Sequence, residues 1–145
     1  MVDAIKIASY ISQRYEYQYG ARIDEMKLQI LLYFMQRESI VRTESPLFES
    51  IFYAHSFGPY LPEVHAAYVS DSLHDILPSS FLEEYRPVFD SVFELLSTKK
   101  TRSLCNLVHG EDSWKHAMMK GEGTPMDIQD IKKDATRFRI RRFLL

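Results

Sequence analysis

Cys105 and His109 are the residues whose types and spacing most directly invite chemistry. They lie four positions apart, so a helix would place them on one face, where a thiol beside an imidazole could be a nucleophile with its base or half of a zinc site. Cys105 is the only cysteine, and no other histidine stands at ligand-type spacing from this pair. We therefore interpret Cys105 as a small apolar residue and His109 as a hydrogen-bonding residue near Trp114, and we expect no catalytic centre, metal or cofactor.

The C-terminal segment "TRFRIRRFLL" interleaves arginines with aromatic and aliphatic residues. A strand would place Arg137, Arg139 and Arg141 on one face, whereas a helix would scatter them. Basic and aromatic side chains together suit nucleic acid. Alternatively, the aromatic residues dock on the domain while the arginines cover the seam, or the arginines bind an acidic protein surface. We favour docking over DNA binding, because one short segment rarely gives a specific site.

Length and composition limit the architecture that can hold these residues. A chain of 145 residues, 46% hydrophobic and 26% charged, fits one domain, residues 1–145, with one core. No apolar run approaches the ~18 residues of a membrane span. The start, "MVDAIKIASYISQRYE", carries acids and a polar face where a signal peptide would be apolar. A single cysteine suits a reducing cytoplasm, so we expect a soluble cytoplasmic protein with no membrane partner.

The net charge of −2 is unevenly distributed along the chain. Residues 43–98 hold nine acids and one base, giving −8, residues 99–145 hold eleven bases and six acids, giving +5, and residues 1–42 add +1. Such asymmetry either steers a charged partner onto one side of the molecule or is cancelled where the fold brings the segments together. The sequence favours neither outcome.

The hydrophobic periodicity of the first half is mainly helical. Residues 4–18 form an amphipathic pattern between an Asp3 N-cap and a Gly20 stop. A second helix begins at Asp24, and its apolar positions leave little polar surface, which predicts burial on most sides. The segment "LFESIFYAHSF" alternates as a short strand or small hairpin does, and Gly58-Pro59 then ends the strand before Pro62 opens a new helix.

The second half is predicted to be helical after a loop over residues 71–80. One helix follows Pro87, a short one covers "TRSLCNLVHG" up to Gly110, and "EDSWKHAMMKG" adds a turn or two. The last helix is expected to have a Thr124 cap with Pro125 in its first position. The conformation of the basic tail stays open. The fold class is thus mainly α, or α+β, as a single compact helical domain with a small β element.

Three motifs in order resemble the Panacea domain, the family of SocA-like antitoxins also described as phage-associated proteins. The first is "KLQILLYFMQ", the second is "PLFESIFYAHSFGPYLPEVHAAY", and the third is "SLCNLVHGEDSWKHA". The positions that match the family pattern structurally are Leu28, Gln29, Gly58, Pro59, Pro62, Glu63, Val64, Leu104, His109 and Trp114. Tyr60 stands where a small aliphatic residue is more usual and His65 where a tyrosine often is, departures that bear on partner choice.

The resemblance implies an antitoxin that binds and neutralises a toxin protein encoded beside it, either directly or by delivery to a protease, and it implies no catalysis. Candidate partner-binding residues are Lys27, Phe57, Tyr60, Arg137, Arg139 and Arg141. For Lys27 we favour a solvated charge at the start of its helix over a contact with an acidic partner. The alternative function is a DNA-binding transcriptional regulator that uses the basic tail.

Overall fold

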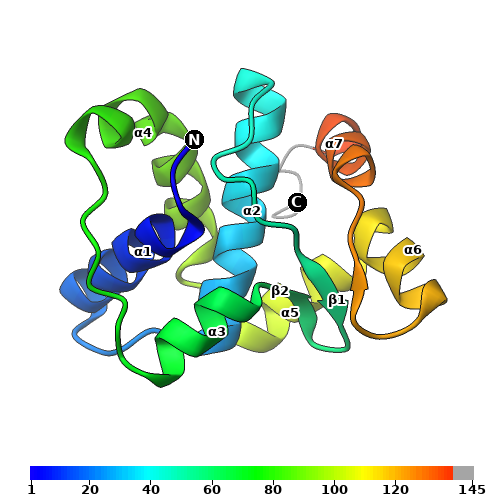
Figure 1. Ribbon diagram of the computed structural model, residues 1–145, viewed down its shortest axis with the longest axis horizontal. Helices are drawn as coiled ribbons and strands as arrows, with labels where there is room; N and C mark the ends of the chain where they lie inside the picture. The colour runs from blue at the N-terminus through cyan, green and yellow to red at the C-terminus, as the bar shows by residue number, and fades with distance from the viewer. Residues whose placement is uncertain (139–145) are drawn as a thin grey trace.

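One long helix, α2 (Glu25–Thr43), runs through the middle of the molecule, and helices α1, α4, α5 and α7 pack around it (Figure 1). The structure is a computed structural model, and it describes residues 1–138. The Asp24 carboxylate caps α2 by accepting the Lys27 N–H at 3.2 Å, at the start that the sequence predicts. Every residue from Lys27 to Ile40 is buried, which confirms the expected burial of this helix on most sides.

Helix α1 (Ala4–Tyr19) has the ends that the sequence predicts. The Asp3 carboxylate accepts the Ile5 N–H at 2.9 Å, and Gly20 ends the helix with a left-handed backbone of φ 69°. Its apolar face contacts α2 and α3. Local hydrogen bonds alone therefore fix both ends of this helix.

The small β element is a hairpin extended by a third strand. Strands β1 (Tyr53–His55) and β2 (Gly58–Tyr60) are antiparallel, with Tyr53 opposite Tyr60. Strand β3 (Thr124–Pro125) pairs with the other edge of β1, giving the order β2-β1-β3. Gly58 and Pro59 thus lie within the second strand, so the expectation that they end a strand is wrong.

Helix α3 (Pro62–Val69) follows the hairpin, with Pro62 in its first turn as predicted. Helix α4 (Ser79–Leu96) differs from the sequence-based expectation, because it begins at Ser79 and contains Pro87. Pro87 lies on the exposed side, and its lost backbone bond is offset by the burial of apolar residues along the opposite face. The buried residues of α4 are Phe81, Val88, Phe89, Val92, Phe93 and Leu96.

Three shorter helices complete the described chain: α5 (Thr101–His109), α6 (Asp112–Lys120) and α7 (Ile128–Arg137). Gly110 ends α5 as expected. The expected Thr124 cap and Pro125 helix start are wrong, because both residues pair with β1. The cap of α7 is instead Asp127, whose carboxylate accepts the Gln129 N–H at 2.8 Å.

The architecture is mainly helical with a small antiparallel sheet, which confirms the predicted fold class. In Figure 1, α1 and α4 lie on one side of α2, while α6, α7 and the hairpin lie on the other. Among residues 1–138, no helix has both the length and the apolar composition that a membrane span needs. Arg139 and Arg141 lie outside the described residues.

Candidate functional site

The side-chain amide of Gln29 fastens α2 to the corner between β2 and α3. Gln29 is buried opposite Leu61, the residue that separates these two elements. Its Oε1 accepts the Leu61 N–H at 3.0 Å, and its Nε2 donates to the Leu61 carbonyl at 3.2 Å. Because buried backbone groups need partners, this paired contact stabilises the corner, while the neighbouring Leu28 fills the core.

Lys27, the first residue of the same motif, has no solvated charge. Its side chain is buried, its ammonium donates to the Ser97 carbonyl at 3.1 Å, and it lies 5.3 Å from the centre of the Tyr15 ring. Ser97 caps the C-terminal end of α4, where a cation is favourable. The expectation of a solvated Lys27 is therefore wrong, and this ammonium joins α2 to the end of α4.

Two residues of the third motif hold the hairpin from the other side. The indole Nε1 of Trp114 donates to the His55 carbonyl at 2.8 Å, and His109 Nε2 donates to the Ser56 carbonyl at 2.9 Å. The His109 and Trp114 rings stack with centroids 4.4 Å apart, as the sequence-based placing of His109 near Trp114 predicts. The carboxylate of Glu122 accepts the Ser56 N–H at 2.9 Å, so the hairpin turn is held from α5, α6 and the α6–β3 loop.

Gly58 is the position where the corner depends on glycine. Its φ of 145° is one that residues with a side chain rarely adopt, and an added Cβ would meet Ile30 Cγ1 at 3.7 Å and Val108 Cγ1 at 3.8 Å. Pro59 beside it is buried, Pro62 and Glu63 lie exposed in the first turn of α3, and Val64 packs in the core. The motif residues thus build a rigid corner.

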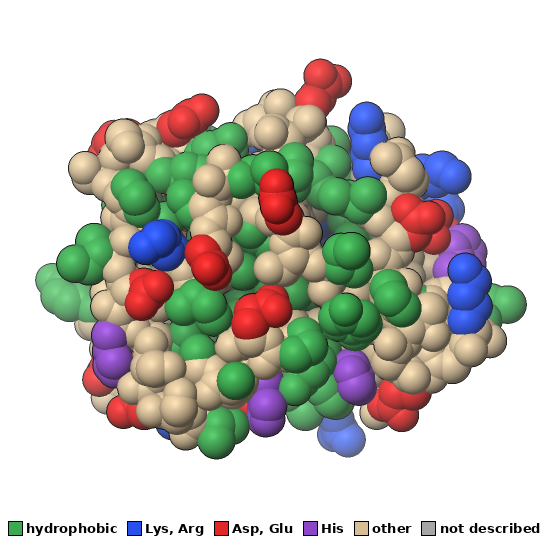
Figure 2. Space-filling view, viewed as in Figure 1, with side chains coloured by type: hydrophobic (Ala, Val, Ile, Leu, Met, Phe, Trp, Pro, Cys, Tyr) green, Lys and Arg blue, Asp and Glu red, His purple; other side chains and the backbone are tan. Residues whose placement is uncertain are grey.

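Four aromatic rings meet on the outer side of this corner. Phe57 stacks on His55 with centroids 5.5 Å apart, and Tyr60 meets the His55 ring edge-on at 4.7 Å. Tyr60 also contacts Phe57 at 5.9 Å and His65, on α3, at 5.7 Å. All four side chains keep part of their surface exposed. In Figure 2, hydrophobic and histidine side chains lie next to one another along the lower edge, over the hairpin and α3.

These rings line a pocket of about 420 Å³ between the hairpin, α3 and the start of α2, which we call the corner pocket. The residues that line it are Asp24, Glu25, Met26, Gln29, His55, Phe57, Tyr60 and His65. The Glu25 carboxylate accepts the His65 Nδ1–H at 2.9 Å. Burial, with the nearby negative charge of Glu25, raises the pKa of Tyr60, so its hydroxyl stays protonated at neutral pH. The pocket therefore combines aromatic walls with carboxylates.

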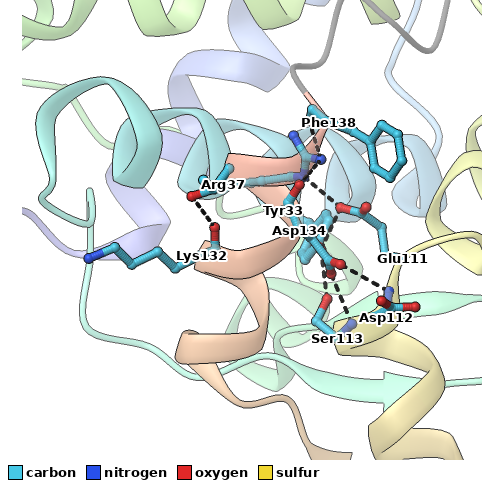
Figure 3. A network of polar contacts seen from close by, with 9 residues as sticks. Tyr33, Arg37, Glu111, Asp112, Ser113, Lys132, Asp134 and Phe138 are labelled. Carbon is cyan, nitrogen blue, oxygen red and sulfur yellow. Dashed lines mark hydrogen bonds and ion pairs between the residues drawn. The ribbon is translucent and has the colours of Figure 1, made fainter.

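A second polar cluster, which we call the buried network, joins α2 to α6 and α7 (Figure 3). Arg37 Nε donates to Glu111 Oε1 at 2.6 Å, and the Tyr33 hydroxyl donates to the same oxygen at 2.9 Å. The side chains of Tyr33 and Arg37, both on α2, are fully buried. Burial raises the pKa of Glu111, although the positive charge of Arg37 opposes this. The pKa of Tyr33 is also raised, mainly by burial and to a smaller extent by the negative charge of Glu111.

The buried network also fastens α7. Arg37 Nη2 donates to the carbonyls of Asp134, at 3.1 Å, and Phe138, at 2.6 Å. The Asp134 carboxylate accepts the N–H groups of Asp112, at 3.2 Å, and Ser113, at 2.9 Å, and so caps α6 from a neighbouring helix (Figure 3). Sequence reasoning missed this cluster, although an arginine in the middle of a helix that is predicted to be buried on most sides is a signal that could have indicated it.

In the part of the chain that the structure describes, no hydrogen bond joins the Cys105 thiol to the His109 imidazole. His109 is bonded to the Ser56 carbonyl and stacked on Trp114. Burial, helped by the charge of Asp24, raises the pKa of the Cys105 thiol, which lowers its nucleophilic fraction at neutral pH. Within residues 1–138, no three His, Cys, Asp or Glu side chains gather as a metal site would require.

Arg137 is the one arginine of the proposed basic tail triad within the described residues. It forms an ion pair with Asp112, whose Oδ2 lies 2.6 Å from Nη1 and 3.0 Å from Nη2. This pairing lowers the pKa of Asp112. The described part of the tail therefore pairs its charge with the start of α6. Phe138 is 48% exposed and does not dock on the core as the docking interpretation expects. The roles of Arg139 and Arg141 stay predictions.

Comparison with known proteins gave one family match. The model of the family described as "Antitoxin SocA-like, Panacea domain" matches residues 28–115. The match begins at Leu28, spans the corner and ends just after Trp114. No curated protein and no solved structure matches the chain significantly.

Proposed function

Because the chain belongs to the family of SocA-like antitoxins with a Panacea domain, we propose that it binds and neutralises a toxin protein encoded beside it. The supporting observation is the corner pocket, where Phe57 and Tyr60 are held half-exposed on a hairpin that α2, α5 and α6 fix in place. Rigid aromatic side chains bind proteins at low entropic cost and are enriched at the centres of interfaces. In this proposal, the protein and its toxin act in the cytoplasm.

Neutralisation in this proposal is a binding event without catalytic chemistry. The raised pKa of the Cys105 thiol and the engagement of His109 in holding the hairpin support it. The buried network supplies no accessible nucleophile or base, because Tyr33, Arg37 and Glu111 are sealed in the core. Direct inhibition of the toxin and its delivery to a protease are two forms of the same binding step.

Co-expression with the adjacent gene tests the proposal. The neighbouring gene product should arrest growth when expressed alone, and this protein should restore growth and form a complex with it. Replacing Tyr60 by alanine should keep the fold and weaken the complex, whereas Tyr17→Ala, at a tyrosine that is 95% exposed on α1, serves as the control. A neighbour that is harmless, or toxic but neither bound nor neutralised, contradicts the proposal.

Two further measurements separate the alternatives. If delivery to a protease neutralises the toxin, its half-life in cells should shorten, whereas direct inhibition should be reproduced with the two purified proteins. The isolated protein should bind duplex DNA weakly and without sequence preference. Tight binding to its own promoter that falls about a thousandfold between roughly 50 and 200 mM salt would support the regulator instead.

A further inference from the structure

The corner pocket has a composition that selects one class of side chain. It is lined by the aromatic residues His55, Phe57, Tyr60 and His65 and by the acidic residues Asp24 and Glu25, of which Asp24 also caps α2 and accepts the Thr101 hydroxyl. We infer that this pocket receives a cationic side chain, an arginine by preference, from the partner protein, an inference that rests on the proposed function. Aromatic faces and carboxylates together are the surroundings that a guanidinium group favours.

The pocket has a negative formal charge when its two histidines are counted as neutral. None of its lining residues, all of which lie in the described part of the chain, is a lysine or an arginine. Glu122, which does not line the pocket, has a carboxylate oxygen 3.7 Å from Nδ1 of the lining residue His55. The start of α2 contributes a positive end worth about half a charge, which the full charges of Asp24 and Glu25 exceed. A cationic guest therefore meets opposite charge.

The pocket is held open before any partner arrives. Gln29, a buried lining residue, is fixed by two hydrogen bonds to Leu61, while the His55 carbonyl accepts a hydrogen bond from Trp114. The volume of about 420 Å³ lies within the usual range of sites that enclose a side chain or small ligand. Because the walls are already ordered, little conformational entropy is lost when the guest binds.

Arginine fits this pocket better than lysine for two reasons. Its planar guanidinium can lie flat against a ring such as Tyr60 while its N–H groups reach a carboxylate, whereas an ammonium is a compact, strongly hydrated charge. Glu25 is the available acceptor, because its side chain is 23% exposed and, among residues 1–138, its hydrogen-bond partners are His65 and, at a longer 3.4 Å, Gln29. The guest and His65 would share this carboxylate.

A small probe tests the pocket without the toxin. The protein is titrated with N-acetyl-arginine amide and, in parallel, with the uncharged N-acetyl-citrulline amide, while NMR follows the resonances of Tyr60, His65 and the Glu25 backbone. The arginine compound should shift these resonances in a saturable way that weakens with added salt, and the citrulline compound should not. Equal responses to both compounds, or no response to either, overturn the inference.

The complex with the adjacent toxin gives the second test. Tyr60→Leu and Glu25→Gln should each weaken binding about three- to thirtyfold, because each removes one partner of a guanidinium. Tyr60→Phe, which keeps the ring, and Glu84→Gln, which removes a carboxylate from the exposed side of α4, are the controls. Replacing one arginine of the toxin should weaken binding by the same factor. Combining this replacement with Glu25→Gln should weaken binding no further.

The outcomes separate the two proposals. Wild-type protein that fails to bind or neutralise the toxin contradicts the proposed function, whatever the amide titration shows. Wild-type protein that binds the toxin, with Tyr60→Leu and Glu25→Gln unchanged in affinity and folded by circular dichroism, overturns the inference and leaves the antitoxin function standing.

Discussion

Replacement of Arg37 by methionine gives the sharpest test of how the C-terminal helix is held. Arg37 is fully buried and donates to Glu111 at 2.6 Å, to the Asp134 carbonyl at 3.1 Å and to the Phe138 carbonyl at 2.6 Å. Methionine fills most of the volume but donates no hydrogen bond. The variant therefore leaves without this donor a buried carboxyl group, the Asp134 carbonyl in the last turn of α7 and the carbonyl of Phe138, which follows the helix.

The expected loss follows from the cost of breaking a buried ion pair. Removing one partner of such a pair lowers the free energy of unfolding by about 3–5 kcal/mol, because the other charge stays desolvated. Urea denaturation followed by circular dichroism measures this loss. Adding Glu111→Leu to Arg37→Met removes the stranded carboxyl group as well and should recover a large part of the stability. Arg86→Met, at an exposed surface pair, is the control and should change little.

The pH dependence of the loss supplies a second check. The folded-state pKa of Glu111 is raised by burial, and Arg37 lowers it only in part, so the variant raises it further. A raised pKa gives stability that is complete below the unfolded-state pKa and is lost as pH rises through the folded-state value. In both proteins the loss should begin as pH rises above the unfolded-state pKa, and in the variant it should extend to a higher pH and be larger. The difference in stability from wild type should therefore be smaller in mild acid than at neutral pH. A difference below about 1 kcal/mol at neutral pH, or one that grows in acid, refutes the reasoning.

Three other predictions concern single residues. Gly58→Val should lower the free energy of unfolding by about 1–3 kcal/mol, because φ is 145° there, and a thermal midpoint equal to wild type would contradict this. Cys105→Ala should cost about 1 kcal/mol in urea denaturation and leave toxin neutralisation intact, and a folded but inactive variant would revive an enzymatic function. Hydrogen bonding from Ser56 lowers the pKa of Glu122, so its stabilisation is present above the ordinary carboxyl pKa and lost as pH falls through the lowered value. Glu122→Gln should therefore be less stable than wild type at neutral pH and equal to it in strong acid, as urea titrations at the two conditions would show.

The sequence by itself determined the elements whose ends depend on bonds within a few residues. Asp3 and Asp24 cap helices through their own backbone neighbours, Gly20 ends α1, and Pro62 opens α3. The motif around the corner likewise predicted the turn into α3, while a partner surface at Phe57 and Tyr60 stays a prediction. These features are local, because each signal and the backbone group it satisfies lie within one helical turn or one hairpin.

Only the tertiary structure decided the features that depend on distant partners. Pro87 lies inside α4 because the burial of a whole apolar face outweighs one lost backbone bond. Thr124 joins a sheet because β1, about seventy residues earlier in the chain, offers it an open edge.

The charged residues show the same division. Lys27 and Arg37 are buried because Ser97, Glu111 and Asp134, each far along the chain, supply the oxygen atoms that a buried cation needs. A sequence pattern gives the polarity of such side chains but not their partners. Whether a charge is solvated, lines the corner pocket or closes the buried network is decided by packing between elements, which local patterns do not specify.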